Sequence, residues 1–357
     1  HEQEIKISGV ISHNYNDILK AEFLNYNLEN FNYLIANKSV ILGGYIQGNI
    51  EISDFYNKQM LFANIVVPNF TFNTNKMGKL SATSQWITAT QAVAMNVSLQ
   101  QGNVYTLKAV GTYVPTTQAI DYDVSLKDFK LSSFKQIFAS TVSNLNGYVD
   151  GDISARGFIK NPQLQGDLEI KRGKFSVNYL KTPYIFKGKI KAKGSKLFFE
   201  NMPLNDTLSN TATVSGYCDL INIRNPQYSI LLETNKLLML NTLESDNDMF
   251  YGKAFVKGDV KLDGNLNFTK ITAVATTLDN TVFNIPLTYS ELSGKHNFLV
   301  FSDTIAKKQV VQNQTSTYLG TEIDMKITVT PDALCQIIFD KKVGDVIKGR
   351  GNGDLQM

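Results

Sequence analysis

Residues that could do chemistry are scarce in this sequence. The 357 residues include only three histidines and two cysteines. Nucleophilic catalysis of the Ser-His-Asp type needs a histidine base beside the nucleophile, yet His13 and His296 stand outside any motif such as Gly-x-Ser-x-Gly. Cys218 and Cys335 lie far apart in separate strand-like segments, so we expect free, buried thiols. The chain has too few cysteines and histidines for a Cys/His metal centre and too few cysteines for a disulfide scaffold.

Two short motifs resemble ligand loops without completing them. Residues 246–248 read Asp-Asn-Asp, but the glycine and the terminal glutamate of an EF-hand are missing. Residues 349–353 read Gly-Arg-Gly-Asn-Gly, but no helix pattern opens there and no Lys-Ser/Thr pair follows. A glycosidase needs two carboxylates about 5–10 Å apart, whereas the acidic residues here alternate with lysines on polar strand faces. We therefore expect no enzyme, no metal site and no cofactor.

The composition favours an all-β protein. Phe (21) and Tyr (16) are abundant, and together with Thr, Val and Ile they suit a pleated, half-buried surface. The 24 glycines, together with many asparagines, supply turns. A charged fraction of 19% excludes a disordered polyelectrolyte. A net charge of +3 is nearly neutral and gives no electrostatic case for a nucleic-acid partner.

The hydrophobic period is two along most of the chain. Apolar and polar residues alternate over residues 187–193, 254–268 and 322–330, which is typical of strands with one buried face. Turn signals recur about every eight to twelve residues, as in a meander of antiparallel strands. One or two short helices are expected as well. Residues 131–142 show amphipathic helical spacing, residues 15–24 show it more weakly, and residues 339–346 suggest a turn or a single helical coil.

A degenerate internal repeat runs through the sequence. Residues 44–52, 147–155 and 254–262 share the form aromatic-apolar-x-Gly-[Asn/Asp]-[Ile/Val], roughly a hundred residues apart. A Phe-Asn or Phe-x-x-Asn pattern follows each of them. Repetition of this kind indicates an array rather than unrelated domains, and we expect no domain boundary within residues 1–357. The apolar face of such a sheet could close on itself, hold an apolar ligand, or face lipid in a membrane barrel.

Several motifs in order resemble one known family. Residues 147–216 contain spaced glycines, Asn161-Pro162, an aromatic strand and a closing Val214-Ser215-Gly216, and the helical pattern of residues 131–142 precedes them. This region resembles the C-terminal region of the TamB family. Residues 249–264, 276–287 and 330–357 resemble its Bacteroidetes form. We expect residues 131–357 to be the TamB-like region and residues 1–130 to extend it by repetition.

The resemblance implies a fold, partners and a location. TamB-like proteins, which belong with the AsmA-like bridge-type lipid transfer proteins, hold a long curled antiparallel sheet, an open taco-shaped groove with an apolar interior. The family is anchored in the inner membrane, crosses the periplasm and pairs with an Omp85-class outer-membrane barrel (TamA-like). Phospholipid conduction and assistance to outer-membrane protein assembly are its implied roles. Since the chain opens at His1 and ends at Met357, we expect it to be a piece of such a protein.

The pattern and the resemblance together nominate groove-lining residues for phospholipid acyl chains. A continuous apolar trough can hold acyl chains without catalytic groups, at about 0.8 kcal/mol per buried CH₂. The expected lining residues are Val256, Val260, Leu262, Leu266, Phe268, Ile323, Met325, Ile327, Val329, Leu168, Ile170, Phe175, Val177, Phe186 and Ile190. The alternatives are an extracellular β-rich adhesin with a sealed core and a carbohydrate-active β-sandwich. At about eleven residues per strand and turn, the chain would hold roughly thirty strands and up to about 150 Å of groove.

Overall fold

The computed structural model describes residues 3–35, 40–73, 75–139, 141–222, 225–246, 250–286, 320–340 and 345–356. They fold almost entirely as β-strands. Contacts divide the chain into two compact units, unit 1 (His1–Ile230) and unit 2 (Leu231–Met357). Each unit is described by itself, and the predicted division of the chain into domains stays a prediction.

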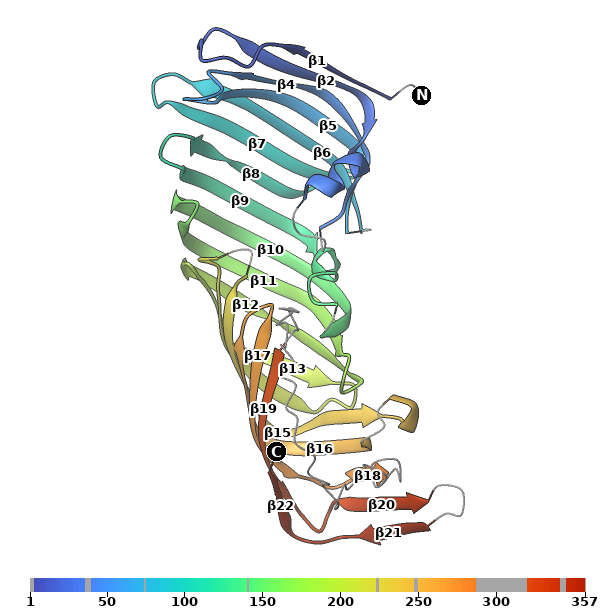
Figure 1. Cartoon of the computed structure of the whole chain (residues 1–357). Coiled ribbons are helices and arrows are strands. Elements are labelled where there is room, and N and C mark those ends of the chain that lie inside the picture. Colours follow the sequence, from blue (N-terminus) through green and yellow to red (C-terminus); the bar gives the residue numbers. More distant parts are fainter. Residues whose placement is uncertain are drawn as a thin grey trace, which may run out of the picture. The chain divides into compact units, whose positions relative to one another are not determined.

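Unit 1 is an antiparallel meander (Figure 1). Its strands are β1 (Glu4–Gly9), β2 (Ile18–Asn27), β3 (Leu42–Gly43), β4 (Tyr45–Ser53), β5 (Met60–Phe72), β6 (Asn75–Ile87), β7 (Ala92–Gln101), β8 (Val104–Val114), β9 (Ala119–Lys130), β10 (Val142–Phe158), β11 (Asn161–Val177), β12 (Thr182–Gly194), β13 (Lys196–Asp206) and β14 (Thr211–Asp219). Each strand from β4 to β13 pairs with the next one along the chain, β2 pairs with β1 and β4, and short β3 pairs with β5. The all-β, curled antiparallel fold is thereby confirmed.

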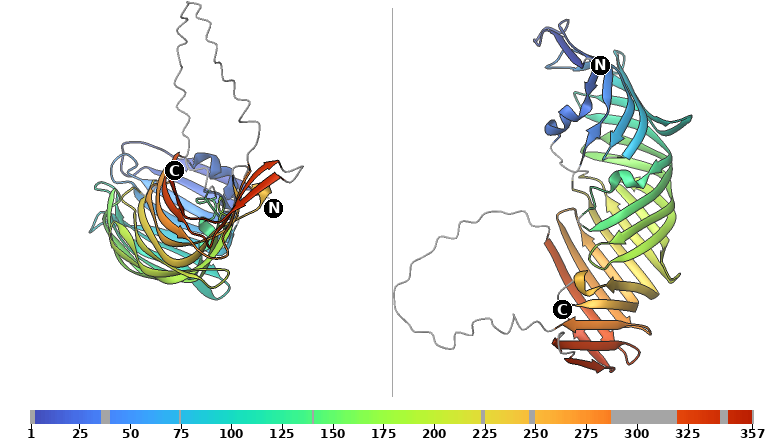
Figure 2. Two further views of the ribbon diagram at one scale, coloured as in Figure 1. Left: turned by 90° about the horizontal axis from the view of Figure 1, so that it is seen from below. Right: turned by 90° about the vertical axis from the view of Figure 1, so that its right-hand side faces the viewer.

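Two 3-10 helices, η1 (Leu28–Leu34) and η2 (Leu131–Phe134), interrupt the meander of unit 1. Figure 2 shows the strands of unit 1 curving, with both short helices on the concave side. The longer helix expected over residues 131–142 is absent, because only its first turn is helical and β10 starts at Val142. The weak helix expected over residues 15–24 is wrong. Residues 18–27 form β2, whose pairing with β1 and β4 outweighs local helical spacing.

Unit 2 contains parallel as well as antiparallel pairs. After β15 (Gln227–Thr242), which begins in unit 1, come the 3-10 helix η3 (Glu244–Asp246), β16 (Tyr251–Gly264), β17 (Phe268–Thr277), β18 (Val282–Pro286), β19 (Gly320–Val329), β20 (Leu334–Asp340), β21 (Asp345–Gly349) and β22 (Gly353–Gln356). Strand β16 is antiparallel to β17 and β18, whereas β17–β19 and β18–β20 are parallel. The candidate coil at residues 339–346 is the end of β20 and the start of β21; residues 341–344 lie outside the described part.

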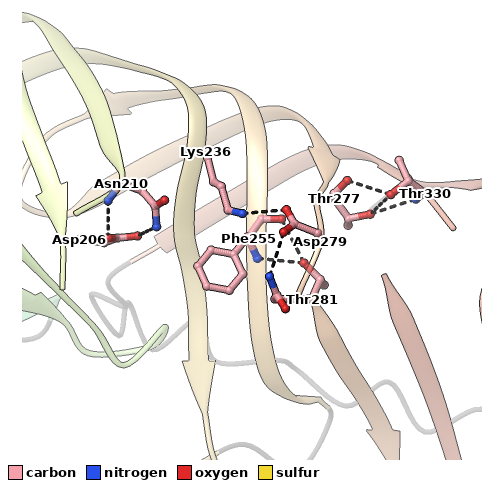
Figure 3. Close-up of polar contacts among 9 residues, drawn as sticks. Asp206, Asn210, Lys236, Phe255, Thr277, Asp279, Thr281 and Thr330 are labelled. Atoms are coloured by element: carbon pink, nitrogen blue, oxygen red, sulfur yellow. Dashed lines mark hydrogen bonds and ion pairs between the residues drawn. The ribbon is translucent and has the colours of Figure 1, made fainter. Parts of the chain in front are cut away.

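Side-chain bonds tie the strand ends of unit 2 together (Figure 3). Lys236 pairs with Asp279 at 2.7 Å. The Phe255 N–H donates to Thr281 Oγ1 at 3.0 Å, and Thr281 Oγ1 donates back to the Phe255 carbonyl. Thr330 donates twice to Thr277: its N–H donates to Thr277 Oγ1 and its hydroxyl donates to the Thr277 carbonyl, both at 3.0 Å. In unit 1, Asp206 accepts from the N–H groups of Leu208 and Asn210 and so closes the β13–β14 turn.

The sequence repeat is also a structural repeat. Its glycines Gly48, Gly151 and Gly258 have φ values of +121°, +134° and +147°. A Cβ on any of them would lie within 2.2 Å of a carbonyl oxygen of the neighbouring strand. Only glycine tolerates that conformation and approach. The twenty-two strands of the described residues are fewer than the thirty or so expected, because strands such as β10 and β11 reach 17 residues each.

Candidate functional site

An unbroken row of apolar residues crosses all thirteen long strands of unit 1. In antiparallel pairs, residues directly opposite each other share a face, so the register of the paired strands defines the row strand by strand. Its members are Ile5, Phe23, Gly48, Ile65, Ala82, Val97, Ala109, Val124, Ile153, Gly166, Ala192, Leu197 and Cys218. At ~4.8 Å per strand, the row is about 58 Å long.

A second apolar row runs beside the first, two residues further along each strand. It crosses ten strands, from β5 to β14, and carries larger side chains. Its members are Val67, Leu80, Leu99, Leu107, Leu126, Gly151, Leu168, Ile190, Phe199 and Gly216. We call the sheet face that bears these two rows the apolar face of unit 1.

The opposite face of the same strands is polar. A row on that face, one residue out of step with the first apolar row, reads Lys6, Glu22, Asn49, Asn64, Thr83, Asn96, Val110, Asp123, Ser154, Gln165, Lys193, Lys196 and Asp219. Val110 is its one apolar member. The sheet of unit 1 therefore separates an apolar face from a water-facing one across its full width.

Glycines on the apolar face bend the sheet toward that face. Gly48, Gly151, Gly166 and Gly216 all lie in the two apolar rows and all have positive φ values. An added Cβ would lie 1.9–2.2 Å from the carbonyl oxygen of the next strand in each case. Without side chains at these points the strands can coil, and curvature follows. The apolar face thus lines the inside of a curve (Figure 2).

Side chains from the short helices cover part of the apolar face at one edge. Leu28 of η1 is buried with Ile46, Val67 and Phe70, and Phe31 packs against the same cluster. A second cluster on this face groups Val149, Leu168, Ile170, Ile190 and Met202. Asn73 anchors η2 to the β5–β6 turn, since its Nδ2 donates to the Ser133 carbonyl at 3.0 Å.

The structure brings together the lining residues predicted in unit 1. Leu168, Ile170, Phe186 and Ile190 lie in or against the second cluster. Phe175 contacts the Phe186 ring edge-to-face, with the ring centroids 5.5 Å apart. A bulge at Arg172, whose φ is +51°, keeps Ile170 and Phe175 on one face although their numbers differ in parity. Val177 ends this face opposite Thr182, a fully buried side chain.

Most of the lining residues predicted in unit 2 also share one face. Val260 and Met325 both lie opposite Ala273, one on each side of β17. Leu262 and Ile323 flank Ile271 in the same way, and Gly258 and Ile327 flank Ala275. Val256 is buried opposite Thr277, and Val329 lies two residues beyond Ile327 on β19.

Two predicted residues lie elsewhere. The alternation over residues 254–268 suggested one strand, but β16 ends at Gly264 and β17 begins at Phe268. Leu266 is therefore in the turn. Phe268 is on the polar face of β17 with Lys270 and Val274, and 42% of its surface is exposed. The chain reverses at Asn265, whose side chain accepts from the N–H groups of Asn267 and Phe268, so the period of two breaks there.

The apolar face contains residues that the sequence analysis did not nominate. Leu99, Leu107 and Leu126 stand in the second row, all within residues 1–130. Alternation was present around them, as in Ile120, Tyr122, Val124 and Leu126 of β9. The same alternation, read along residues 1–130, identifies these leucines as lining residues.

Burial changes the ionisation of groups on the apolar face. It raises the pKa of Tyr184 to about 12. It also raises the pKa of Tyr122, whose hydroxyl donates to Met95 Sδ at 3.0 Å. The pKa of the Cys218 thiol rises for the same reason, with a further contribution from Asp219. All three groups are uncharged at neutral pH.

The buried carboxylate of Asp150, in the second repeat, joins β9, β10 and β11 on the polar face. Asp150 accepts from Lys171 at 2.7 Å, from Lys127 at 3.0 Å and from the Asp128 N–H at 2.6 Å. Burial would raise its pKa, but the bonds from Lys171, Asp128 and Lys127 outweigh burial and lower the pKa to about 2. Asp128 is the bulged residue of β9, with φ of +48°. Gln47 occupies the position of Asp150 in the first repeat. Its Nε2 donates to Oδ1 of Asn25, the bulged residue of β2.

The remaining candidate groups are placed as follows. His13 stacks on Tyr56, with ring centroids 4.4 Å apart. His296 and residues 247–248 lie outside the described residues. Gly349 ends β21 and Gly353 opens β22, so the glycine-rich stretch is strand and connection. Among the described residues, no three His, Cys, Asp or Glu side chains gather as metal ligands. None of the described helices has the length and apolar character to cross a membrane.

Comparison with known families decides the assignment. Residues 200–357 match the family model of the TamB C-terminal domain. This segment belongs to the TamB family. The resemblance predicted from the sequence is thus confirmed over residues 200–357; the match begins in unit 1, within β13, and runs through unit 2. No curated protein matches the chain, and no solved structure matches it.

The TamB match fits the two-faced strands described above. The matched segment includes the unit 2 face of Val260, Leu262, Met325 and Ile327. The paired strands of unit 1 carry the same separation of faces through residues that precede the match. The TamB assignment is consistent with a role in lipid transport or assembly.

Proposed function

We propose that this chain is part of a TamB-like bridge in which the apolar face holds phospholipid acyl chains. The observation that supports it is the thirteen-strand apolar row of unit 1. Transfer of each CH₂ from water onto such a face contributes about 0.8 kcal/mol. Because the row is continuous and lacks a charged member, an acyl chain can move along it without meeting a desolvated charge.

Each unit has its own proposed lining. In unit 1 it consists of the two apolar rows with Ile170, Phe175, Val177 and Phe186, and in unit 2 of Val256, Val260, Leu262, Ile323, Met325, Ile327 and Val329. Headgroups would stay in water beside the face. Sliding of this kind needs no reaction, so we propose a non-catalytic transport role. Assistance to outer-membrane protein assembly would use the same face for apolar segments of client proteins.

The TamB match supports a location in the Gram-negative envelope. We propose that the parent protein is anchored in the inner membrane, crosses the periplasm and meets an Omp85-class, TamA-like barrel at the outer membrane. The alternative, an extracellular β-rich protein with a sealed core, is not favoured by the TamB match. It predicts that the purified chain holds no lipid.

A matched pair of variants on β8 tests lipid binding. Leu107 lies in the second apolar row, whereas Val110 lies on the polar face with 52% of its surface exposed. Leu107→Arg should abolish co-purified phospholipid, measured by native mass spectrometry, because an arginine interrupts the row. Val110→Arg adds the same side chain to the same strand and should retain the lipid.

Photo-crosslinking provides a test that does not depend on the arginine variant folding. A photoreactive residue at Ile153 should crosslink to a photoactivatable phospholipid, and the same residue at Ser154, on the opposite face of β10, should not. Equal crosslinking at the two positions, or lipid retained by Leu107→Arg in a folded protein, would contradict the proposal.

A further inference from the structure

A line of lysines runs along the polar face of β12. Lys187, Lys189, Lys191 and Lys193 occupy every second position of the strand, and all four are exposed. Side chains at this spacing point to the same face about 6.6–6.8 Å apart, so the four ammonium groups extend over about 20 Å. We call them the lysine stripe.

The lysine stripe is not neutralised by neighbouring side chains. Among the residues that the structure describes, none forms an ion pair or a hydrogen bond with these four ammonium groups, although Glu169 and Asp167 of β11 lie opposite Lys189 and Lys191. By contrast, Lys171 on the same face is bonded to Asp150, and Lys196 is near Asp219. The stripe therefore remains available to a ligand.

Charge is concentrated in this part of the chain. Residues 161–206, which form β11, β12 and β13, contain nine basic and four acidic residues, a net charge of +5. The whole chain carries +3, so the remainder is slightly negative. The local positive charge is a property of these three strands and attracts anions to them.

The neighbours of the stripe decide what shape of anion fits. Carboxylates border it on the same face, with Asp167 and Glu169 on β11 and Glu200 on β13. A broad anionic surface such as a bilayer would bring its phosphates against these carboxylates. A narrow, extended chain laid along β12 would lie over the lysines, with the carboxylates of β11 and β13 beside it and not beneath it.

We propose that the lysine stripe binds an extended acidic peptide segment with a carboxylate at every second residue. Such a segment places its carboxylates about 6.6–6.8 Å apart on one side, which matches the lysine spacing. Each ammonium–carboxylate pair is exposed and contributes modestly, and four in register add up. The stripe is on the face opposite the apolar rows, so a bound peptide leaves the proposed lipid face free.

The test uses three eight-residue, fluorescein-labelled peptides and the intact chain. One alternates Glu and Thr, one has four Glu followed by four Thr, and one alternates Gln and Thr. Fluorescence anisotropy at low salt should show that the alternating acidic peptide binds at least about tenfold more tightly than the block peptide. The Gln peptide should not bind, and 0.5 M salt should release the acidic one, as expected for screened charges.

Two quadruple variants of equal charge locate the site. Lys187, Lys189, Lys191 and Lys193 changed to Gln should weaken binding at least about tenfold. The control changes four exposed lysines scattered elsewhere, Lys79, Lys108, Lys135 and Lys160, to Gln and should bind as the unmodified chain does. Co-purified lipid and circular dichroism should be unchanged in both variants, which separates this proposal from the lipid-binding one.

Three outcomes would overturn the proposal. Equal weakening in the two variants would mean that only net charge matters. Equal affinity for the alternating and block peptides would remove the argument from spacing. Stripe-dependent binding to phosphatidylglycerol vesicles or to oligo-dT with no preference for the peptide would assign the stripe to a lipid surface or a nucleic acid instead.

Discussion

Gly151 and Leu168 lie directly opposite each other in β10 and β11, at the middle of the second apolar row. The φ of Gly151 is +134°, and a Cβ there would lie 2.2 Å from the Asp167 carbonyl oxygen. The close approach of the two strands therefore depends on the missing side chain. We expect Gly151→Ala to destabilise the protein by about 1–3 kcal/mol, measured by urea unfolding. Gly349→Ala, with an open surrounding and an ordinary φ, should change stability little; equal losses would contradict this account of curvature.

Asp150 makes stability depend on pH in the acid range. Its folded pKa of about 2 is below the ordinary value of 3.8, so the carboxylate stabilises the fold above pH 4 and this stabilisation is lost as the pH falls from about 4 to about 2. The contribution is at most about 2 kcal/mol, reduced by the water that reaches Lys127 and Lys171. Asp150→Asn should remove it and flatten the pH profile in that window. Asp123→Asn, at a carboxylate whose side chain is 72% exposed, should leave the profile unchanged.

Asn73 is the link between the β5–β6 turn and η2. It is buried, it accepts from the Ile41 N–H at 2.8 Å and it donates to the Ser133 carbonyl. Asn73→Ala leaves the Ile41 N–H and the buried Ser133 carbonyl without these partners, which costs about 1–3 kcal/mol. Hydrogen exchange should speed up in residues 131–139 and around residue 41 before it does in the strands. Asn103→Ala, in an exposed turn, is the control, and uniform acceleration along the chain would argue against a local role.

The proposed lining in unit 2 can be interrupted at two points. Leu262 and Ile327 lie on the proposed lining face of unit 2, because they pair with Ile271 and Ala275 of β17. We expect the double variant Leu262→Arg, Ile327→Arg to lose co-purified lipid while circular dichroism retains the β signal. Val274→Arg, at a polar-face position of β17 that is 60% exposed, should keep the lipid. Undiminished lipid in the folded double variant would exclude unit 2 from the binding face.

Cys218 reports directly on the apolar face. It ends the first apolar row opposite Leu197, and burial raises its pKa and so lowers its thiolate fraction at neutral pH. In a Cys335→Ser background, Cys218 should react with a thiol reagent more slowly than a free peptide thiol at pH 8. Added phospholipid should slow it further if the row is occupied. A rate equal to that of the peptide thiol would show that water reaches this end of the row freely.

Sequence patterns predict which residues of neighbouring strands lie together better than they predict neighbours from strands far apart in the sequence. The pattern and the resemblance predict Leu168 and Ile190 as lining residues, and the two lie opposite each other because neighbouring strands pair in order. Met325 and Val260 are predicted in the same way, but they flank Ala273 of β17 through one parallel and one antiparallel pairing. No local pattern encodes a parallel partner, because the residues that choose it lie in other strands.

A period of two predicts the wrong face wherever a bulge or a turn interrupts the strand. Ile170 and Phe175 share a face only because the Arg172 bulge inserts one residue. Leu262 and Phe268 have matching parity and yet lie on opposite faces, since the chain reverses between β16 and β17. The helical spacing of residues 131–142 yielded one 3-10 turn, because the strand pairing of β10 begins at Val142.

The sequence by itself determined which side chains of each strand separate from water, because successive side chains of an extended chain point to opposite faces whatever the neighbours are. Its glycine pattern also marked the repeated close approaches at Gly48, Gly151 and Gly258. Only the tertiary structure decided how the faces of separate strands join into rows, since register, bulges and partner order depend on hydrogen bonds between segments distant in sequence. The continuous apolar face exists because the apolar positions of thirteen strands lie opposite one another, and bulges such as those at Asp128 and Arg172 keep them aligned.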